Sequence, residues 1–128
     1  MSDALSNDME THLLNYTFST TSVTRPTAWY IALHTSDPTD TGANEISGNG
    51  YARQSITFTV SGNTATSNSV VTFPAATGST WGTITHCSIW TSSSSGTMIG
   101  HSALTASKTI AVGDIMQVAS GSITFTLT

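Results

Sequence analysis

The residue types best suited to chemistry gather in one polar stretch, HTSDPTDTGANE, at positions 34–45. It carries one histidine and three carboxylates, namely His34, Asp37, Asp40 and Glu45. Oxygen-rich loops of this kind can hold Ca²⁺. The carboxylates lack the alternate spacing and the central glycine of an EF-hand loop, however, and an aspartate before a proline is typical of a turn in which its side chain accepts nearby backbone N–H groups. We therefore favour a structural loop and expect no metal.

Hydrolysis of a polysaccharide would need two carboxyl groups facing one glycosidic bond, one of them with a raised pKa. The candidates in this chain are Asp37, Asp40, Glu45 and Asp114. Nothing in the sequence places one of these carboxyl groups in an apolar pocket that would raise its pKa. Because the chain has so few charges, we expect Arg53 to pair with a carboxylate of the 34–45 stretch instead.

The histidines and the cysteine give no stronger case for catalysis. His34, His86 and His101 fall in strand patterns, and no spacing marks them as metal ligands or as a ring about a three-fold axis. Ser and Thr are roughly a third of the residues, so a histidine near a hydroxyl is no sign of a catalytic triad. Cys87 is the single cysteine, which excludes an intramolecular disulfide and favours a small buried side chain. The sequence predicts a protein that is not an enzyme and has no cofactor.

Composition limits the partners. The 128 residues suffice for one domain, only 8% are charged, and the net charge is −4. The three basic residues are scattered, whereas a phosphate backbone or an anionic bilayer surface needs clustered Lys and Arg. No apolar run is long enough for a membrane span, and the N-terminal residues do not resemble a secretory signal. We expect neither nucleic acid nor a membrane as a partner.

The elements that position these residues are expected to be strands. From residue 27 onward apolar and polar residues alternate with a period of two, and many of the polar ones are threonines, which suit a pleated sheet. The pattern predicts an all-β fold, an antiparallel two-sheet β-sandwich or jelly roll. About eight strands are expected, at 27–34, 51–60, 64–73, 82–91, 97–104, 108–112, 115–119 and 121–128.

The N-terminal segment has a different period. Residues 3–16 predict an amphipathic helix, capped by Ser2 or Asp3 and followed by an extended arm at 17–24. We therefore divide the chain into a helix and arm at 1–24 and a sandwich domain at 25–128. A helix this short is marginal in water, so its apolar face should dock on the sandwich or on a neighbouring subunit. That candidate interaction face consists of Leu5, Met9, Leu13 and Tyr16.

Aromatic side chains offer a different binding surface, since exposed Trp and Tyr stack on sugars. The strand alternation of Trp29 and Trp90 favours the core for both residues. Trp81 precedes a glycine in a predicted loop and is the best surface candidate, which makes a glycan a possible partner.

Several of these segments together resemble a family of small bacteriophage virion proteins known as tail-fibre proteins. The matching blocks are YIALHTSDP at Tyr30–Pro38, GANE at Gly42–Glu45, GYARQ at Gly50–Gln54, and WGT-x-TH at Trp81–His86. Related chains often continue the last block with Phe-Gly-Ile, whereas this chain has Cys-Ser-Ile at 87–89. The resemblance implies a structural virion protein assembled in the host cytoplasm, and it carries no catalytic residues.

Size and pattern lead to three hypotheses for its place on the particle. A chain of 128 residues without a repeat cannot form a long shaft, so the first hypothesis is a capsid decoration protein that binds the major capsid protein as a homotrimer. The alternative is a small tail-fibre or head-fibre component involved in host attachment, with tail proteins as partners. The second alternative is a carbohydrate-binding β-sandwich module.

Overall fold

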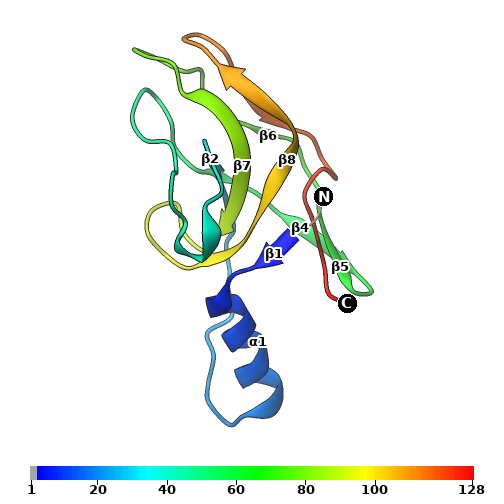
Figure 1. Cartoon of the computed structure of the whole chain (residues 1–128). Helices are drawn as coiled ribbons and strands as arrows, with labels where there is room; N and C mark the ends of the chain where they lie inside the picture. The colour runs from blue at the N-terminus through cyan, green and yellow to red at the C-terminus, as the bar shows by residue number, and fades with distance from the viewer. Residues whose placement is uncertain (1–2) are drawn as a thin grey trace.

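The protein is mostly β, with one N-terminal helix, and its strands form three antiparallel sheets (Figure 1). The computed structural model describes residues 3–128. The larger sheet has the strand order β1-β8-β7-β2-β3, the second has the order β10-β5-β4, and the third pairs β6 with β9. The elements are β1 (Asp3–Leu5), α1 (Asn7–Phe18), β2 (Tyr30–His34), the 3₁₀ turn η1 (Thr39–Thr41), β3 (Gln54–Ser55), β4 (Phe58–Ser61), β5 (Thr64–Ser67), β6 (Val71–Thr72), β7 (Gly82–Trp90), β8 (Met98–Ile110), β9 (Gln117–Val118) and β10 (Thr124–Thr126).

The centre of the larger sheet is β7, which pairs with β2 on one side and with the long β8 on the other. Alternation along β2 sends Ile31 and Leu33 to one face, where they join the hydrophobic core. This core lies between the larger sheet and the two smaller ones. Its largest fully buried apolar side chains are Phe73, Ile31, Leu33, Ile56, Ile84 and Ile89.

The other face of the same sheet is also closed, although its residues are small or polar. Ala32, His34 and Ser88 are fully buried there. The loop at 35–46 returns along this face and pairs with β2. The N–H of Ile46 donates a hydrogen bond to the carbonyl of Leu33 at 3.1 Å. A bridge also joins His34 to Glu45. The polar stretch singled out in the sequence therefore covers this face of the sheet, and we call residues 35–46 the cover loop.

The predicted two-sheet sandwich is wrong in detail, because two of the expected strands change sheet midway. The expected strand 51–60 is divided between β3 and β4, and the expected strand 64–73 between β5 and β6. At the first division the buried Ile56 turns its N–H to the carbonyl of Trp29, and the chain then leaves for the second sheet. The expected strands 97–104 and 108–112 are in turn one strand, β8, because no turn interrupts residues 105–107.

The helix exists but begins later than residues 3–16 predict. Residues 3–5 form β1, so Leu5 pairs with Gly100 of β8 and is no part of the helix. Ser6 is the N-cap, since its hydroxyl accepts the N–H of Met9 at 3.1 Å and donates to the carbonyl of Met98. The proposed cap Ser2 lies outside the described residues. The strand pairing of β1 thus takes priority over an earlier start of the helix.

The helix α1 stands away from the β-rich body (Figure 1), and none of its twelve residues is buried. After Phe18 the chain returns to β2 through residues 19–29, which have no regular structure. Within the described part of the chain, no helix has the length and apolar character needed to cross a membrane.

Candidate functional site

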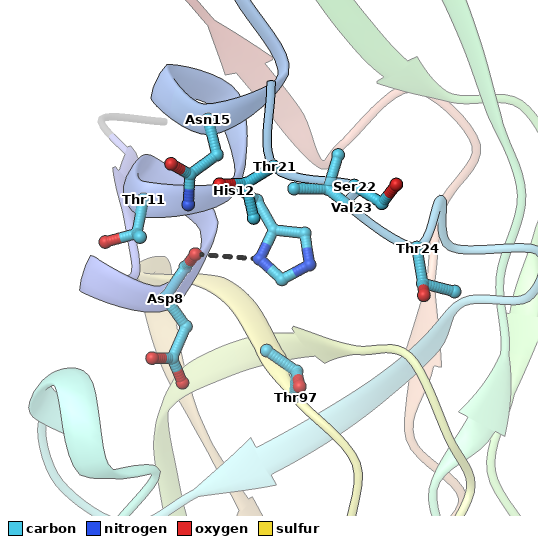
Figure 2. Close-up of a pocket in the computed structure, with 9 residues that line it drawn as sticks. All are labelled: Asp8, Thr11, His12, Asn15, Thr21, Ser22, Val23, Thr24 and Thr97. Atoms are coloured by element: carbon cyan, nitrogen blue, oxygen red, sulfur yellow. Dashed lines mark hydrogen bonds between the residues drawn. The ribbon is translucent and has the colours of Figure 1, made fainter. Parts of the chain in front are cut away.

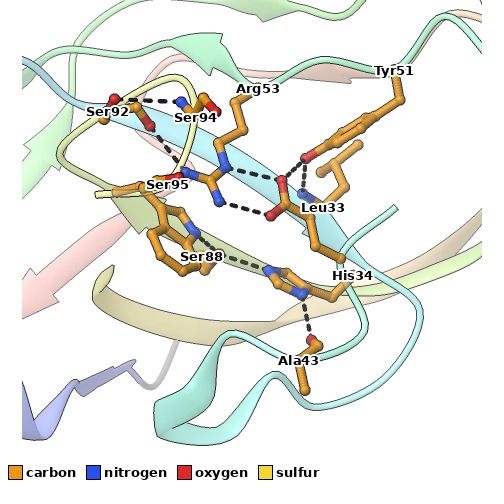
Figure 3. A network of polar contacts seen from close by, with 11 residues as sticks. Leu33, His34, Ala43, Tyr51, Arg53, Ser88, Ser92, Ser94 and Ser95 are labelled. Atoms are coloured by element: carbon orange, nitrogen blue, oxygen red, sulfur yellow. Dashed lines mark hydrogen bonds and ion pairs between the residues drawn. The ribbon is translucent and has the colours of Figure 1, made fainter. Parts of the chain in front are cut away.

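Arg53, labelled in Figure 3, forms an ion pair with Glu45, the last residue of the polar stretch 34–45. Arg53 donates from Nη2 to Glu45 Oε1 at 2.8 Å and from Nε to Oε2 at 2.9 Å. The two side chains are 9% and 21% exposed for Arg53 and Glu45, respectively. This two-point geometry confirms the expected pairing of Arg53 with a carboxylate of the 34–45 stretch, and it is the stronger form of such a contact.

Arg53 also holds the turn between β7 and β8. Its Nη1 donates to the carbonyl oxygens of Ser92 at 3.0 Å and Ser95 at 2.8 Å. Its guanidinium carbon lies 4.0 Å from the ring centroid of Trp90, a cation–π contact. One side chain thereby connects the cover loop, the segment after it and the serine-rich turn, which are far apart in the sequence.

Tyr51 links the ion pair to the apolar core. Its hydroxyl donates to Glu45 Oε2 at 2.8 Å and accepts the N–H of Leu33 at 3.1 Å. Its ring lies edge-on to Trp81, with centroids 5.5 Å apart, and stacks with Phe73 at 6.2 Å. The hydroxyl of this tyrosine therefore joins the ion pair, while its ring packs against the core.

His34 completes what we call the loop network, formed by His34, Glu45, Tyr51, Arg53, Ser88 and Trp90. Its Nδ1 lies 2.8 Å from the carbonyl of Ala43, and its Nε2 lies 2.7 Å from Ser88 Oγ. The indole N–H of Trp90 donates to the same Ser88 Oγ at 2.7 Å. A neutral ring protonated on Nδ1 satisfies every bond, because the Ser88 hydroxyl then donates to Nε2 and accepts from Trp90.

The environment fixes the charge states of the loop network. Burial lowers the pKa of His34 and keeps the ring neutral. Burial by itself raises the pKa of Glu45, but hydrogen bonds from Arg53 and Tyr51 and the charge of Arg53 outweigh it, and the net pKa is below the ordinary value. Burial and the neighbouring carboxylate raise the pKa of Tyr51. The network thus holds one anion and one cation among four neutral side chains, a set suited to holding backbone in place.

Of the remaining carboxylate candidates, Asp37 and Asp114 serve turns. Asp37 Oδ1 accepts the N–H of Thr39 at 2.8 Å, which confirms the turn role expected for an aspartate before proline. Asp40 is exposed on η1, and Asp114 Oδ2 accepts the N–H of Ala111 at 3.0 Å. His101 lies 3.8 Å from Asp37, too far for a hydrogen bond. In residues 3–128 no three His, Cys, Asp or Glu side chains are grouped so that they could hold a metal ion.

Trp81 corrects the sequence analysis, which placed it on the surface. The residue is only 4% exposed and belongs to the core, with its indole N–H on the carbonyl of Asn49 at 2.8 Å. Its ring fits against Tyr51 and Phe73, partners that are distant in the sequence. Trp29 and Trp90, expected in the core, are both half-buried, and of the two Trp29 packs against the core.

The candidate interaction face at the N-terminus is divided by the structure. Leu5 lies in β1 and Met9 is half-buried, whereas Leu13 and Tyr16 of α1 are 39% and 77% exposed. The sequence analysis missed Leu14 and Phe18, which are 61% and 82% exposed. Their four-residue spacing places them on one side of the helix, a signal that was present in the sequence.

A polar groove runs between α1 and the returning segment 21–24 (Figure 2). It is open to solvent and has a cavity volume of about 530 Å³. Its polar side chains include Asp8, His12 and Asn15 from one side of the helix, and the backbone carbonyl of Asp8 lies 3.2 Å from His12 Nδ1. A smaller cavity of about 280 Å³ shares His12, Thr24 and Thr97 with it and adds Arg25, so the two lie side by side.

These observations indicate the general class of the protein. The buried polar side chains hold backbone together, and the uncovered features are an apolar helix and a polar groove, as in a structural or binding protein. The chain belongs to the family described as podophage GP4 fiber I protein gp80, whose family model matches residues 4–126. No curated protein matches the chain.

The family makes the protein a fibre component of a phage virion, and it confirms the resemblance seen in the sequence. It is a family of structural proteins and not of enzymes, in agreement with the sequence analysis. The match favours the alternative hypothesis, a fibre component, over the capsid decoration protein that we placed first. A fibre protein associates with other virion proteins, and the homotrimer stays a prediction.

Replacing Arg53 with lysine tests the geometry of the ion pair while keeping its charge. A lysine cannot bond both carboxylate oxygens and two carbonyls at once, and it loses the stacking on Trp90. We expect R53K to lower the free energy of unfolding by about 2 kcal/mol in urea denaturation. The control R25K changes an exposed arginine and should stay within about 0.5 kcal/mol of the parent; equal losses in both variants would contradict the role of Arg53.

Gly42 tests how closely the cover loop packs on Trp90. Both Gly42 and Gly48 have a positive φ, +72° and +70°, so alanine is strained at either position. A Cβ at Gly42 would lie 2.5 Å from the Trp90 ring, whereas one at Gly48 would meet nothing within 4 Å. We expect G48A to cost about 1 kcal/mol and G42A about 3 kcal/mol in urea denaturation. Similar costs would show that the loop does not rest on Trp90.

The neutral state of His34 predicts a pH dependence of stability. Its pKa in the folded protein is below the ordinary 6.5, so as pH falls below about 6.5 the unfolded chain takes up a proton first and folding loses stability. The loss should continue down to the folded-state pKa, at no more than about 1.4 kcal/mol per pH unit for one proton. Urea midpoints between about pH 7.5 and about pH 5.5 measure it, in a range above the titration of Glu45.

The matched variants for this pH series are H34Q and H86Q. The first removes the buried titrating ring and should flatten the pH slope even though it destabilises the fold. The second replaces a histidine whose ring contacts the neighbouring Thr85 hydroxyl. It should keep most of the slope, because burial lowers the pKa of His34 more than the charge of His86 does. A parental slope retained in H34Q would rule out His34 as its source.

Proposed function

We propose that this protein is a small fibre component that attaches to a neighbouring virion protein through the apolar side chains of α1. Its family supports the first part of this proposal, and the uncovered helix supports the second. In this proposal the attachment segment is α1 with the residues that follow it up to 24, while β1 and residues 25–128 form the β-rich body that the fibre displays.

The observation that carries the attachment is the amount of apolar surface on α1. Leu13, Leu14, Tyr16 and Phe18 are all exposed. Leu14 and Phe18 share one side of the helix, and their exposed apolar surface of roughly 300 Å² is at the level that marks interaction sites on soluble proteins. Both acidic residues of the helix, Asp8 and Glu10, lie in its first turns, so the half that follows is uncharged.

The helix also gains little from its own body. A helix of twelve residues is marginal in water, and its stability ordinarily comes from packing an apolar face. Here the half-buried positions of α1 are Met9, His12 and Asn15, so a largely polar side faces the body. A partner that covers Leu14 and Phe18 would supply the packing that the chain itself does not.

A second candidate function is glycan contact at the groove between α1 and residues 21–24. Hydroxyl, amide, imidazole and carboxylate groups line it, and these are the hydrogen-bonding groups that a sugar requires. We infer that N15A would weaken binding to a host glycan by roughly tenfold if this groove were the contact, measured by titration calorimetry with host surface polysaccharide.

Attachment through α1 predicts which variants leave the virion. The double variant L14S/F18S removes burial worth about 3 kcal/mol, roughly a hundredfold in affinity, so its amount in purified virions should fall sharply. Quantitative mass spectrometry of virions assembled with each variant measures this amount against the other tail proteins.

The control for this test is V112S/I115S. Val112 and Ile115 are exposed to a similar degree, at 57% and 58%, but they lie in the turn that follows β8. The control should enter virions at the parental level. Equal incorporation of the two double variants would contradict attachment through α1, and circular dichroism checks that both remain folded.

A further inference from the structure

The groove between α1 and residues 21–24, shown in Figure 2, continues into the smaller cavity beside it. His12, Thr24 and Thr97 line both cavities, so the two form one surface, which we call the helix groove. Serine and threonine hydroxyls make up much of its lining, and such groups both donate and accept hydrogen bonds. The helix groove therefore suits a ligand that is rich in hydrogen-bonding groups.

Charged side chains of opposite sign line the two halves of the helix groove. Asp8 lines the larger cavity and Arg25 the smaller one. Within the described part of the chain no carboxylate forms an ion pair with Arg25, whereas Arg53 is bound to Glu45 at two points. The guanidinium of Arg25 is therefore available to an anionic group of a ligand.

The larger half offers acceptors and donors for hydroxyl groups. The ring of His12 projects from α1 into the groove (Figure 2), and its Nδ1 lies 3.2 Å from the backbone carbonyl of Asp8. Because a carbonyl only accepts, Nδ1 carries the proton in this contact, and Nε2 is left for a ligand. The hydroxyl of Ser19 donates to Asn15 Oδ1 at 3.2 Å, which leaves the amide N–H groups of Asn15 to donate. The hydroxyls of a sugar match this half, since each can donate and accept.

The rest of the lining favours a charged sugar over a neutral one. Its apolar side chains, Met9, Val23 and Pro26, are half-buried and can contact the C–H groups of a sugar ring. No aromatic side chain of residues 3–128 lines either cavity, so a sugar gains nothing here from stacking on an aromatic ring. Hydrogen bonds must then supply the affinity, and a bond to a charged group is about twice as strong as one between neutral groups.

We propose that the helix groove binds a saccharide that carries one carboxylate, such as a uronic acid unit of an acidic polysaccharide. The carboxylate pairs with Arg25 in the smaller half, and sugar hydroxyls bond to Asp8 and Asn15 in the larger half. This inference rests on the second proposed function, glycan contact at this groove, and adds the chemical class of the glycan. Because the groove is open to solvent, a polysaccharide chain can continue beyond it.

The charge balance limits the ligand to one carboxylate within the groove. A dense polyanion such as a polyphosphate needs clustered cations, whereas the helix groove holds one arginine and one aspartate. The net charge of −4 on the chain adds to the repulsion of such a polymer. A single planar guanidinium, in contrast, matches a single carboxylate at two points.

Paired oligosaccharides test this class of ligand. Oligomers of galacturonic, glucuronic and mannuronic acid are each compared with the same oligomer after its carboxyl groups have been reduced to primary alcohols. Titration calorimetry with the full chain measures each affinity. We expect at least one acidic oligomer to bind about tenfold or more tightly than its reduced form, because only the acid can pair with Arg25.

The outcomes separate this inference from the glycan function itself. Equal affinity for both members of every pair would overturn the inference, and the glycan function would still stand if N15A weakened both. No binding of any oligomer would overturn the inference together with the glycan function that it deepens.

Two glutamine variants locate the contact. R25Q removes the charge of Arg25 and should lower the affinity for the acidic oligomer about tenfold, to the level of its reduced form. K108Q removes the same charge from Lys108, which is exposed on β8 and lines neither cavity, and should keep the parental affinity. Similar losses in both variants would show that overall charge attracts the acid, and this result would overturn the assignment to Arg25.

A lysine at the same position separates charge from geometry. R25K keeps the charge but cannot bond both carboxylate oxygens through one planar group, so its affinity for the acidic oligomer should lie between those of the parent and R25Q. Because Arg25 is exposed, both variants should keep the parental urea midpoint, which excludes a folding defect as the cause. A folded R25Q protein that still prefers the acidic oligomer as strongly as the parent would overturn the inference.

Discussion

The fold depends on the paired contact between Glu45 and Arg53 more than on any other polar interaction. In a chain with only three basic residues, one arginine connects the cover loop, the segment that follows it and the turn between β7 and β8. Its carboxylate partner is bonded in turn by Tyr51, which reaches into the core. Removing either charge would leave the other half-buried without its partner, which costs far more than an exposed pair contributes.

This constraint also explains why the most reactive-looking part of the sequence is not a catalytic site. Hydrogen bonds within the protein already engage the polar groups of His34, Glu45 and Tyr51, whose partners are other side chains of the loop network and the backbone. The surface that remains available to partners includes the uncharged half of α1 and the groove beside it. A rigid body that presents its contacts on peripheral elements suits the structural role of its family.

The local sequence pattern predicted much of this architecture. The errors arose where contacts with other parts of the chain determine the position of a residue. The period of two, the turn role of Asp37, the N-terminal helix and the pairing of Arg53 with a carboxylate are all readable from short segments. The start of the helix was not, because Leu5 is drawn into β1 by pairing with Gly100. Nor was the burial of Trp81, which depends on Tyr51 and Phe73. The number of sheets depends on the chain crossing after Ile56, where no glycine or proline marks a break.

The central claim is that the protein serves as a fibre component, and its number of copies per particle tests this most directly. Quantitative mass spectrometry of purified virions, referenced to the major capsid protein, gives that number. A fibre component attached at the tail predicts a small number of copies, far below that of the capsid protein. A number comparable with that of the capsid protein would indicate a decoration protein on the shell and contradict the account, and so would the absence of the protein from the virion.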